Sequence, residues 1–206
     1  MIDICQPGWV GCALAFLTLC KVGFVSGFCV PCNVLKIVWG RLGKVMDVWI
    51  CTECFNRVTY NTRVAHVTPI INWNGQILPV KKIAEKAHLR GNEVVVDGAP
   101  SFAQLDFKVP DLGADYFATS LHKWLYAPIG TGMRSVKKNK IKGLYPLFAT
   151  NEYPLKDDIR KFEHLGTRPF FIEQAIGKAI EFHEMIGIER KQQRLHYLKN
   201  YWMGKV

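Results

Sequence analysis

Apolar and polar residues follow their most regular pattern between residues 63 and 136. The run at residues 63–71 is rich in β-branched side chains and leads into a turn signal at residues 72–75, which predicts a strand. Pro79 opens a predicted helix, because its fixed φ and missing N–H suit the first helical turn. Gly91 follows this helix as a stop signal. The apolar face of the helix consists of Val80, Ile83, Ala84 and Ala87.

Three shorter segments predict further strands of the same domain. Residues 94–96 are consecutive valines, a pattern typical of a strand that is covered on both faces. Residues 114–119 and 132–136 are two more candidate strands. Because a strand, a helix and a strand at this spacing form a parallel βαβ unit, the sequence predicts an α/β fold whose mostly parallel sheet is flanked by helices.

The end of the chain predicts two helices. Residues 170–186 have helical periodicity, and residues 189–202 predict a second helix that is amphipathic and basic. The apolar face of the first helix consists of Ile172, Ala175, Ile176, Ala179 and Phe182. We therefore divide the chain into a leader at residues 1–58, an α/β core at residues 59–150 and a helical segment at residues 151–206.

The leader differs in composition from the rest of the chain. All seven cysteines lie in it: Cys5, Cys12, Cys20, Cys29, Cys32, Cys51 and Cys54. Residues 9–30 are almost continuously apolar, and about 20 apolar residues suffice to cross a bilayer. Lys21 lies within this window and disfavours insertion. A membrane segment at residues 9–30 is one alternative for the leader, and incidental buried thiols are another.

Two Cys-x-x-Cys pairs provide a third alternative. Cys29 with Cys32, and Cys51 with Cys54, have the spacing with which four thiolates bind a structural zinc ion. The first pair lies in an apolar run, whereas zinc-binding turns are usually polar. We therefore assign no metal ligand.

The chain is basic, with a formal net charge of +10 at pH 7. The densest basic clusters are Lys137, Lys138, Lys140 and Lys142, and then Arg190, Lys191 and Arg194. Such clusters are more often solvated faces than binding sites, and aromatic residues do not alternate with them as they do in RNA-binding motifs. We therefore expect solvated basic faces and no nucleic-acid partner.

Residues suited to a cofactor site follow two of the predicted strands. Asp97 comes directly after the valine run, and Ser120, His122 and Lys123 come directly after residues 114–119. In a parallel sheet the carboxyl ends of the strands form one edge, and ligands bind at that edge. Taken alone, each residue has a structural alternative, such as a cap for the aspartate or a solvated surface for the lysine.

Together these residues have the chemistry that pyridoxal phosphate requires. Its ring nitrogen needs an acid, for which Asp97 is the candidate, and its aldehyde needs an amine, for which Lys123 is the candidate. Ser120 and His122 can donate to the phosphate, and so can the amides around residues 130–132. The sequence therefore predicts a pyridoxal-phosphate site at this edge of the sheet.

The order of these residues resembles that of a known family. The resemblance extends from about residue 62 to residue 203 and rests on five segments: NGQILPV (74–80), VDGAPSFAQ (96–104), DYFATSLHKW (115–124), GTGM (130–133) and FEHLGTRP (162–169). These segments are similar to the class V aminotransferase family of fold-type I pyridoxal-phosphate enzymes, which includes isopenicillin-N epimerase-like proteins and cysteine desulfurases. The core would then be part of the large cofactor-binding domain.

The resemblance implies a role for each candidate residue. Lys123 would form the internal aldimine with pyridoxal 5'-phosphate, and Asp97 would contact the ring nitrogen. Ser120 and His122 would hold the phosphate. The implied enzyme is a transferase or isomerase, namely an aminotransferase or an epimerase-like protein that acts on an amino acid.

Two further residues, a partner and a location follow from the same resemblance. Asn72 would contact the substrate or the cofactor, and Thr167 would reach the phosphate across the interface of a homodimer. We expect a cytoplasmic protein, or a membrane-associated one if residues 9–30 span a bilayer. A desulfurase is the least favoured activity, because it needs a nucleophilic cysteine after the lysine and none follows Cys54.

The sequence departs from the family pattern in three places. Pro100 stands where the family usually has histidine or glutamine. Before Tyr60 we find neither a phosphate-binding loop nor an aromatic residue to stack on the cofactor ring, and the small C-terminal domain is missing. The chain therefore looks like a partial copy, and a truncated or degenerate member without catalysis is the alternative to a working enzyme.

Overall fold

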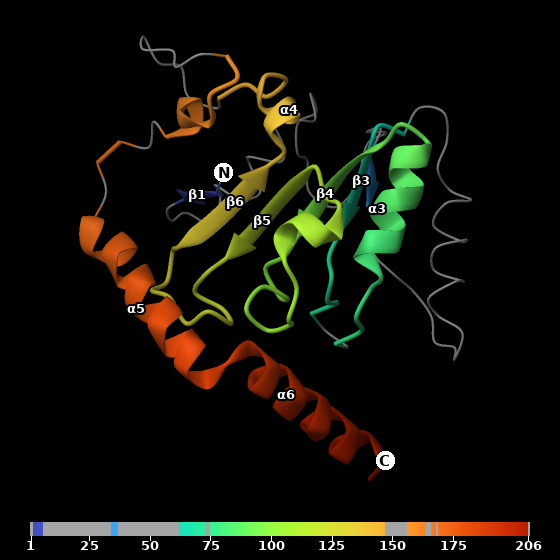
Figure 1. The fold of residues 1–206 in the computed structure, drawn as a ribbon, viewed down its shortest axis with the longest axis vertical. Coiled ribbons are helices and arrows are strands. Elements are labelled where there is room, and N and C mark those ends of the chain that lie inside the picture. Colours follow the sequence, from blue (N-terminus) through green and yellow to red (C-terminus); the bar gives the residue numbers. More distant parts are fainter. Residues whose placement is uncertain are drawn as a thin grey trace, which may run out of the picture.

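The structure, a computed structural model, describes residues 62–72, 75–146, 156–163, 166–167 and 169–205, and the backbone of two strands in the leader. A six-stranded sheet, in the order β1-β6-β5-β4-β3-β2, forms the centre of the protein (Figure 1). The strands from β2 to β5 pair in parallel, whereas β6 is antiparallel to both of its neighbours. The predicted α/β fold with a mostly parallel sheet is confirmed.

The predicted βαβ unit consists of β3 (Val64–Val67), α3 (Val80–Leu89) and β4 (Glu93–Asp97). β3 is shorter than the predicted strand, because only an isolated bridge between Ile70 and Ile77 continues it. The four residues predicted for the inner face of α3 are all buried. The two strands pair in parallel, as their spacing predicts.

The other strands are β5 (Tyr116–Ser120), β6 (Gly132–Val136), β1 (Ile2–Cys5) and β2 (Val34–Lys36). The bounds of β6 match the prediction. β6 runs antiparallel to β5 because a short connection, without a crossover helix, turns the chain back. The two strands of the leader lie at the two margins of the sheet.

Both faces of the sheet are covered, which explains the run of valines. Val94 and Val96 pack with Phe117 in a cluster that includes the inner face of α3. Val95 points to the opposite face, where its cluster includes Tyr116 and Val136. The elements that cover this second face include α4 (Lys138–Ile141) and the 3-10 helix η2 (Ile159–Phe162). A second 3-10 helix, η1 (Val109–Leu112), lies beside α3.

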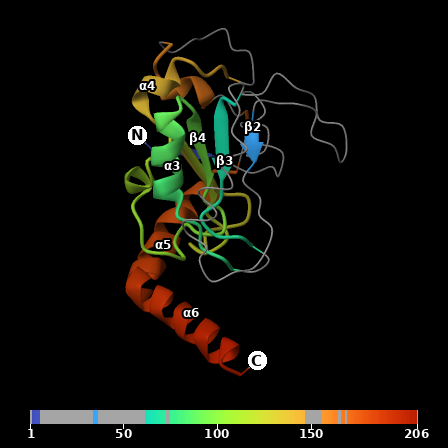
Figure 2. The same ribbon diagram turned by 90° about the vertical axis from the view of Figure 1, so that its right-hand side faces the viewer.

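Two helices complete the described chain. The buried residues of α5 (Phe170–Ile186) belong to the same core cluster as residues of the sheet, and α6 (Ile188–Met203) extends away from the sheet to the C-terminus (Figures 1 and 2). The bounds of α5 match the prediction, and Ile176 and Ala179 are buried as expected. The prediction that Phe182 is buried is wrong, since its side chain is 48% exposed. Its ring meets the ring of Tyr126 edge-on, and this contact covers only part of it.

The prediction that the second basic cluster is solvated is wrong for Lys191, which is 7% exposed. Lys191 is buried because its ammonium group contacts the main-chain oxygens of Ala103, in the turn after β4, and Trp124, in the turn after β5. Arg190 and Arg194 are exposed, as expected of a solvated face.

The alternatives for the leader fall outside the described residues. Residues 9–30 and both Cys-x-x-Cys pairs belong to that part of the chain. Within the described part, no helix is long and apolar enough to cross a bilayer. The same part contains no group of three or more His, Cys, Asp or Glu side chains that could hold a metal ion.

Candidate functional site at the carboxyl edge of the sheet

Asp97 and Ser120 end two neighbouring parallel strands. Asp97 is the last residue of β4, and its Cα partner in β5 is Ala118. Ser120 ends β5 two residues beyond that pair. Both residues therefore lie at the same edge of the sheet, which is the edge where the sequence predicted a ligand site.

The turn after Asp97 fixes the orientation of its carboxylate. The amide of Ala99 donates to Oδ1 of Asp97 at 3.0 Å, and no described residue donates to Oδ2. Gly98 allows this turn to lie close to β5, since a Cβ at this position would lie 2.2 Å from Cζ of Phe117. The carboxylate is half-buried, so it is oriented by the protein and still accessible to a ligand.

Lys123 lies in a tight turn between β5 and β6. The turn is closed by the amide of Tyr126, which donates to the oxygen of Lys123, and by the amide of Ala127, which donates to the oxygen of Leu121. Leu121 is 3% exposed and anchors the start of the turn, whereas the side chain of Lys123 is exposed. The main chain of Lys123 is thus held in place while its amine remains accessible.

His122 carries a buried nitrogen without a partner. Nδ1 of His122 is inaccessible to solvent and makes no hydrogen bond in the described part of the chain. Buried polar atoms are rarely left unpaired in native proteins, and each exception needs an explanation. A ligand that accepts or donates a hydrogen bond at this nitrogen would remove the cost of leaving it unpaired.

The glycine-rich turn at residues 130–132 is partly occupied by its own hydrogen bonds. The amide and the hydroxyl of Thr131 both donate to the oxygen of Pro128, at 3.2 and 2.8 Å. The oxygen of Thr131 accepts from the amide of Leu121. The turn therefore supports the segment that carries Lys123, and the amide of Thr131 is already used within the protein.

Asn72 lies beyond the carboxyl end of β3. The amide of Gly75 donates to the oxygen of Ile71, and the amide of Ile71 donates to the oxygen of Gln76, which forms a turn around Asn72. Its side chain is exposed. Because β3 is the parallel neighbour of β4, Asn72 follows a strand that ends at the same edge as Asp97.

Of the predicted site residues, Thr167 is the one most distant in sequence from the strands that end at this edge. It is exposed, just before α5, and next to Gly166 with its φ of 70°. No hydrogen bond described in the structure joins it to Asp97 or Lys123. Its proposed contact across a dimer interface is a prediction that a single chain does not test.

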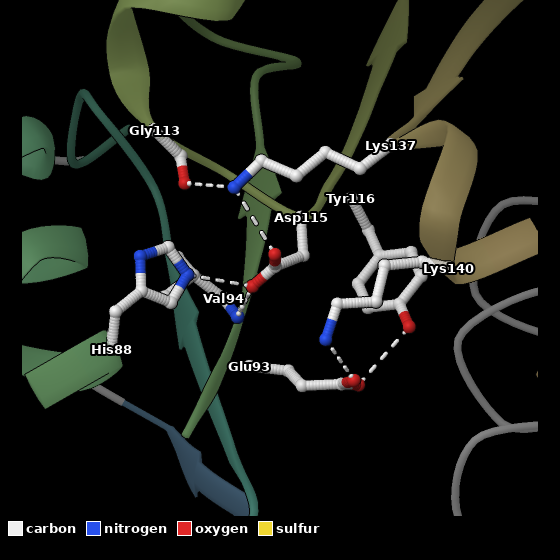
Figure 3. Close-up of polar contacts among 8 residues, drawn as sticks. All are labelled: His88, Glu93, Val94, Gly113, Asp115, Tyr116, Lys137 and Lys140. Atoms are coloured by element: carbon white, nitrogen blue, oxygen red, sulfur yellow. Dashed lines mark hydrogen bonds and ion pairs between the residues drawn. The ribbon is translucent and has the colours of Figure 1, made fainter. Parts of the chain in front are cut away.

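The sequence predicted no role for the opposite edge of the sheet, which carries a network of polar contacts (Figure 3). Asp115 lies just before β5 and is 4% exposed. Its Oδ2 accepts from the amide of Val94 at 2.8 Å and lies 2.8 Å from Nε2 of His88. Its Oδ1 accepts from Nζ of Lys137 at 3.1 Å.

Burial would raise the pKa of Asp115, but these hydrogen bonds, together with the charge of Lys137, outweigh it and hold the pKa below its ordinary value. The carboxylate therefore joins the start of β4, the end of α3 and the end of β6. The sequence places Asp115 at the start of an apolar strand, but it does not show which other segments the carboxylate contacts.

A second group of this network surrounds Glu93 at the start of β4 (Figure 3). Its Oε2 accepts from the hydroxyl of Tyr116 at 3.0 Å, and its Oε1 accepts from Nζ of Lys140 at 2.6 Å. Burial, followed by the charge of Glu93, raises the pKa of Tyr116. These contacts connect β4 to β5 and α4, so the polar side chains at the amino edge of the sheet stabilise the fold.

The comparisons with known proteins agree with the motifs. Residues 40–206 match the sequence model of the aminotransferase class-V family. The chain is 31% identical over 153 residues to an isopenicillin N epimerase of Amycolatopsis lactamdurans and 32% identical over 158 residues to a probable cysteine desulfurase of Halalkalibacterium halodurans. These matches cover 66% and 72% of this chain, but 38% of the length of each relative.

A solved structure has the same fold over most of the chain. It is a C-DES variant with glycine covalently linked to its PLP cofactor, and it aligns with a TM-score of 0.62 at 22% sequence identity. The alignment covers 69% of this chain and 41% of that one. With the family match over residues 40–206, we conclude that the chain belongs to the aminotransferase class-V family.

Proposed function

We propose that the chain is the cofactor-binding part of a pyridoxal-phosphate-dependent enzyme that acts on an amino acid. Lys123 would bind the cofactor covalently, Asp97 would contact the ring nitrogen, and Ser120 would bind the phosphate. The observation that carries the proposal is that Asp97 and Ser120 end neighbouring parallel strands, with Lys123 in the turn that follows. The acid, the hydroxyl and the amine are thereby brought to one edge from two segments of the chain.

Two features of the structure support the fit of these residues to the cofactor. The unpartnered, buried Nδ1 of His122 suits a phosphate oxygen. The carboxylate of Asp97 is oriented at Oδ1 by the amide of Ala99, and its Oδ2 is available to accept from a protonated ring nitrogen. The nitrogen of His122 would thus contact the anionic phosphate of the cofactor, and the carboxylate of Asp97 would contact its protonated ring nitrogen.

Each residue of the candidate site would then have its own role in the reaction. Pyridoxal phosphate, when bound, withdraws electrons from the α-carbon of an amino acid and so lowers the barrier to removing its α-proton. Asp97 would favour the protonated ring nitrogen through its negative charge. Nζ of Lys123 would be released when the amino group of the substrate takes its place, and it could then remove the α-proton and return it, while Ser120 and His122 would keep the phosphate in place.

We propose transamination or epimerisation as the reaction of this site. Transamination and epimerisation need a base that moves the α-proton, which Lys123 would supply. A homodimer, as the resemblance implies, would bring Thr167 to the phosphate of the partner's site.

Titration of the purified full chain with pyridoxal phosphate tests this proposal. We expect a saturable visible absorption band from the lysine-bound cofactor, and we expect Lys123→Ala to abolish it. Lys82→Ala is the matched control, since Lys82 is an exposed lysine of α3 and lies outside the candidate site. The circular dichroism spectrum of each variant shows whether the fold is retained.

Two outcomes would contradict the proposal. One is a wild-type chain that shows no band at saturating cofactor. The other is a folded Lys123→Ala variant whose band equals that of Lys82→Ala, because the cofactor would then bind at a different amine.

A further inference from the structure

Lys191 of α6 is a buried lysine that contacts both segments of the candidate site. Its Nζ donates to the oxygen of Trp124 at 2.5 Å and to the oxygen of Ala103 at 2.9 Å. Trp124 directly follows Lys123, and Ala103 lies in the turn that begins after Asp97. One ammonium group therefore bridges the segment after β4 and the segment after β5.

The rest of the ammonium group's surroundings also come from this region. Its Nζ lies 3.3 Å from Nδ1 of His183 in α5 and 4.3 Å from the centroid of the Tyr126 ring. A lysine ammonium has three hydrogen-bond donors and is attracted to the face of an aromatic ring. Burial lowers the pKa of Lys191. Its charged form makes the contacts with the two carbonyl oxygens and with the face of the ring.

The two turns that Lys191 joins have unusual backbones. Among the described residues, Ala103 and Tyr126 are the two non-glycine residues with positive φ, at 58° and 66°. Side chains disfavour this conformation, so it persists only where surrounding contacts hold it. Nζ of Lys191 donates to the oxygen of Ala103, which has a positive φ. It also donates to the oxygen of Trp124, two residues before Tyr126, and lies over the Tyr126 ring. Lys191 therefore stabilises both turns at their strained positions.

A neighbouring residue of α6 holds one of the two turns without reaching the other. Oε1 of Gln192 accepts from the amide of Asp106 at 2.7 Å. The contact is exposed and involves only the segment after β4. A substitution of Gln192 therefore removes one contact of α6 but leaves the link between the two turns intact, and it serves as a control for Lys191.

We infer that Lys191 is a positioning residue that joins the turns following Asp97 and Lys123 and thereby sets the spacing between these two side chains. The inference rests on the proposed function of Asp97 and Lys123 as cofactor ligands. The ring nitrogen and the aldehyde carbon belong to one rigid ring, so the acid and the amine must meet it at the same time. A link between the two turns is the direct way to fix that spacing.

Amide hydrogen exchange of the cofactor-free full chain tests the link itself. Lys191→Met keeps the length of the side chain and removes its charge and donors. We expect the amides of Gln104, Leu105, Tyr126 and Ala127 to exchange at least about tenfold faster, as expected when hydrogen bonds to a charged donor are lost. The amides of β4 and α3 should keep their rates, and so should all amides in Lys199→Met, which replaces an exposed lysine of the same helix.

The rate of covalent cofactor attachment, followed by the visible band, tests the functional consequence. We expect Lys191→Met to slow attachment by about tenfold or more, because the acid and the amine no longer meet the ring together. Gln192→Ala should speed exchange only near Asp106 and leave attachment within about twofold of the wild-type rate. Lys199→Met should match the wild type.

The outcomes separate this inference from the proposed function. If the wild-type chain attaches no cofactor, the proposed function fails, while the exchange rates still decide whether Lys191 joins the turns. Unchanged exchange in both turns, or attachment at the wild-type rate in a folded variant, would overturn the inference. If Lys191→Met does not fold, Lys191→Gln, which keeps one neutral donor, is measured instead, with the same direction expected and the same results overturning the inference.

Discussion

Nε2 of His88, in the last turn of α3, lies 2.8 Å from Oδ2 of Asp115, just before β5 (Figure 3). This contact connects the helix of the βαβ unit to the start of β5, the strand that follows the unit along the chain. It lies at the amino edge of the strands, whereas Asp97 and Ser120 end β4 and β5 at the carboxyl edge. One edge of the sheet is thus held by a buried polar network, and the other leaves polar atoms available to a ligand.

Asp115→Asn should destabilise the protein. The amide keeps the shape of the side chain but loses the charge that Lys137 contacts, and one of its two ends can no longer accept. We expect the free energy of unfolding, measured in urea, to fall by about 2–4 kcal/mol. Asp111→Asn, at an exposed aspartate of η1, should change it by less than about 0.5 kcal/mol. Equal effects of the two variants would show that the network is not important for stability.

The same carboxylate should make stability depend on acid pH. Because the folded pKa of Asp115 is lowered, its contribution is complete above the ordinary aspartate value of about 3.9 and is lost as the pH falls through the lower folded value. Unfolding free energies measured from about pH 6 to pH 2 should therefore fall more steeply for the wild type than for Asp115→Asn. Parallel curves would contradict this account.

Tyr116→Phe removes a single hydroxyl from the network. Glu93 keeps its contact with Lys140, so the loss should be moderate, about 1 kcal/mol in the free energy of unfolding. Tyr145→Phe is the control, since Tyr145 is 68% exposed. In alkaline titration followed by ultraviolet absorbance, Tyr116→Phe should remove a tyrosine that ionises late, because burial and Glu93 raise the pKa of Tyr116. Loss of an early-ionising tyrosine instead would contradict that pKa direction.

Gly98→Ala should disturb the turn after Asp97. The added methyl group would lie 2.2 Å from Cζ of Phe117, a ring that is 2% exposed and has little room to move. We expect thermal and urea unfolding to report a loss of about 1–3 kcal/mol and cofactor binding to weaken. Gly177→Ala, in an open position of α5, should be neutral or stabilising.

A second substitution checks the steric cause. Phe117→Leu in the Gly98→Ala background makes room for the methyl group, so the double variant should lose less than the sum of the two single variants. Additive losses would show that the two side chains do not collide.

The sequence predicted the elements whose pattern is local. The inner face of α3, the bounds of α5 and the position of β6 follow from the local pattern of apolar residues, and Pro79 marks the start of α3. The carboxyl ends of β4 and β5 were predicted to within one residue, and with them the positions of Asp97 and Ser120. The roles of these residues at a cofactor were predicted from their chemistry and from the family resemblance, and the pyridoxal-phosphate experiments decide them.

The features that sequence reasoning missed depend on contacts between distant segments. Periodicity assigns Phe182 to an apolar face, but it does not say how far a neighbour covers that face. Lys191 belongs to a basic cluster by composition, and its burial depends on two carbonyl oxygens that lie 67 and 88 residues away in the sequence. The network of Asp115 likewise joins α3, β4 and β6, which no local pattern reveals.

Borohydride reduction of the wild-type chain with pyridoxal phosphate, followed by peptide mass mapping, tests the central claim most directly. Reduction converts the lysine–cofactor bond into a stable label on whichever lysine has bound the cofactor. The account predicts that the label is found on Lys123 and disappears in Lys123→Ala. A label spread over exposed lysines, or concentrated on a lysine other than Lys123, would contradict it.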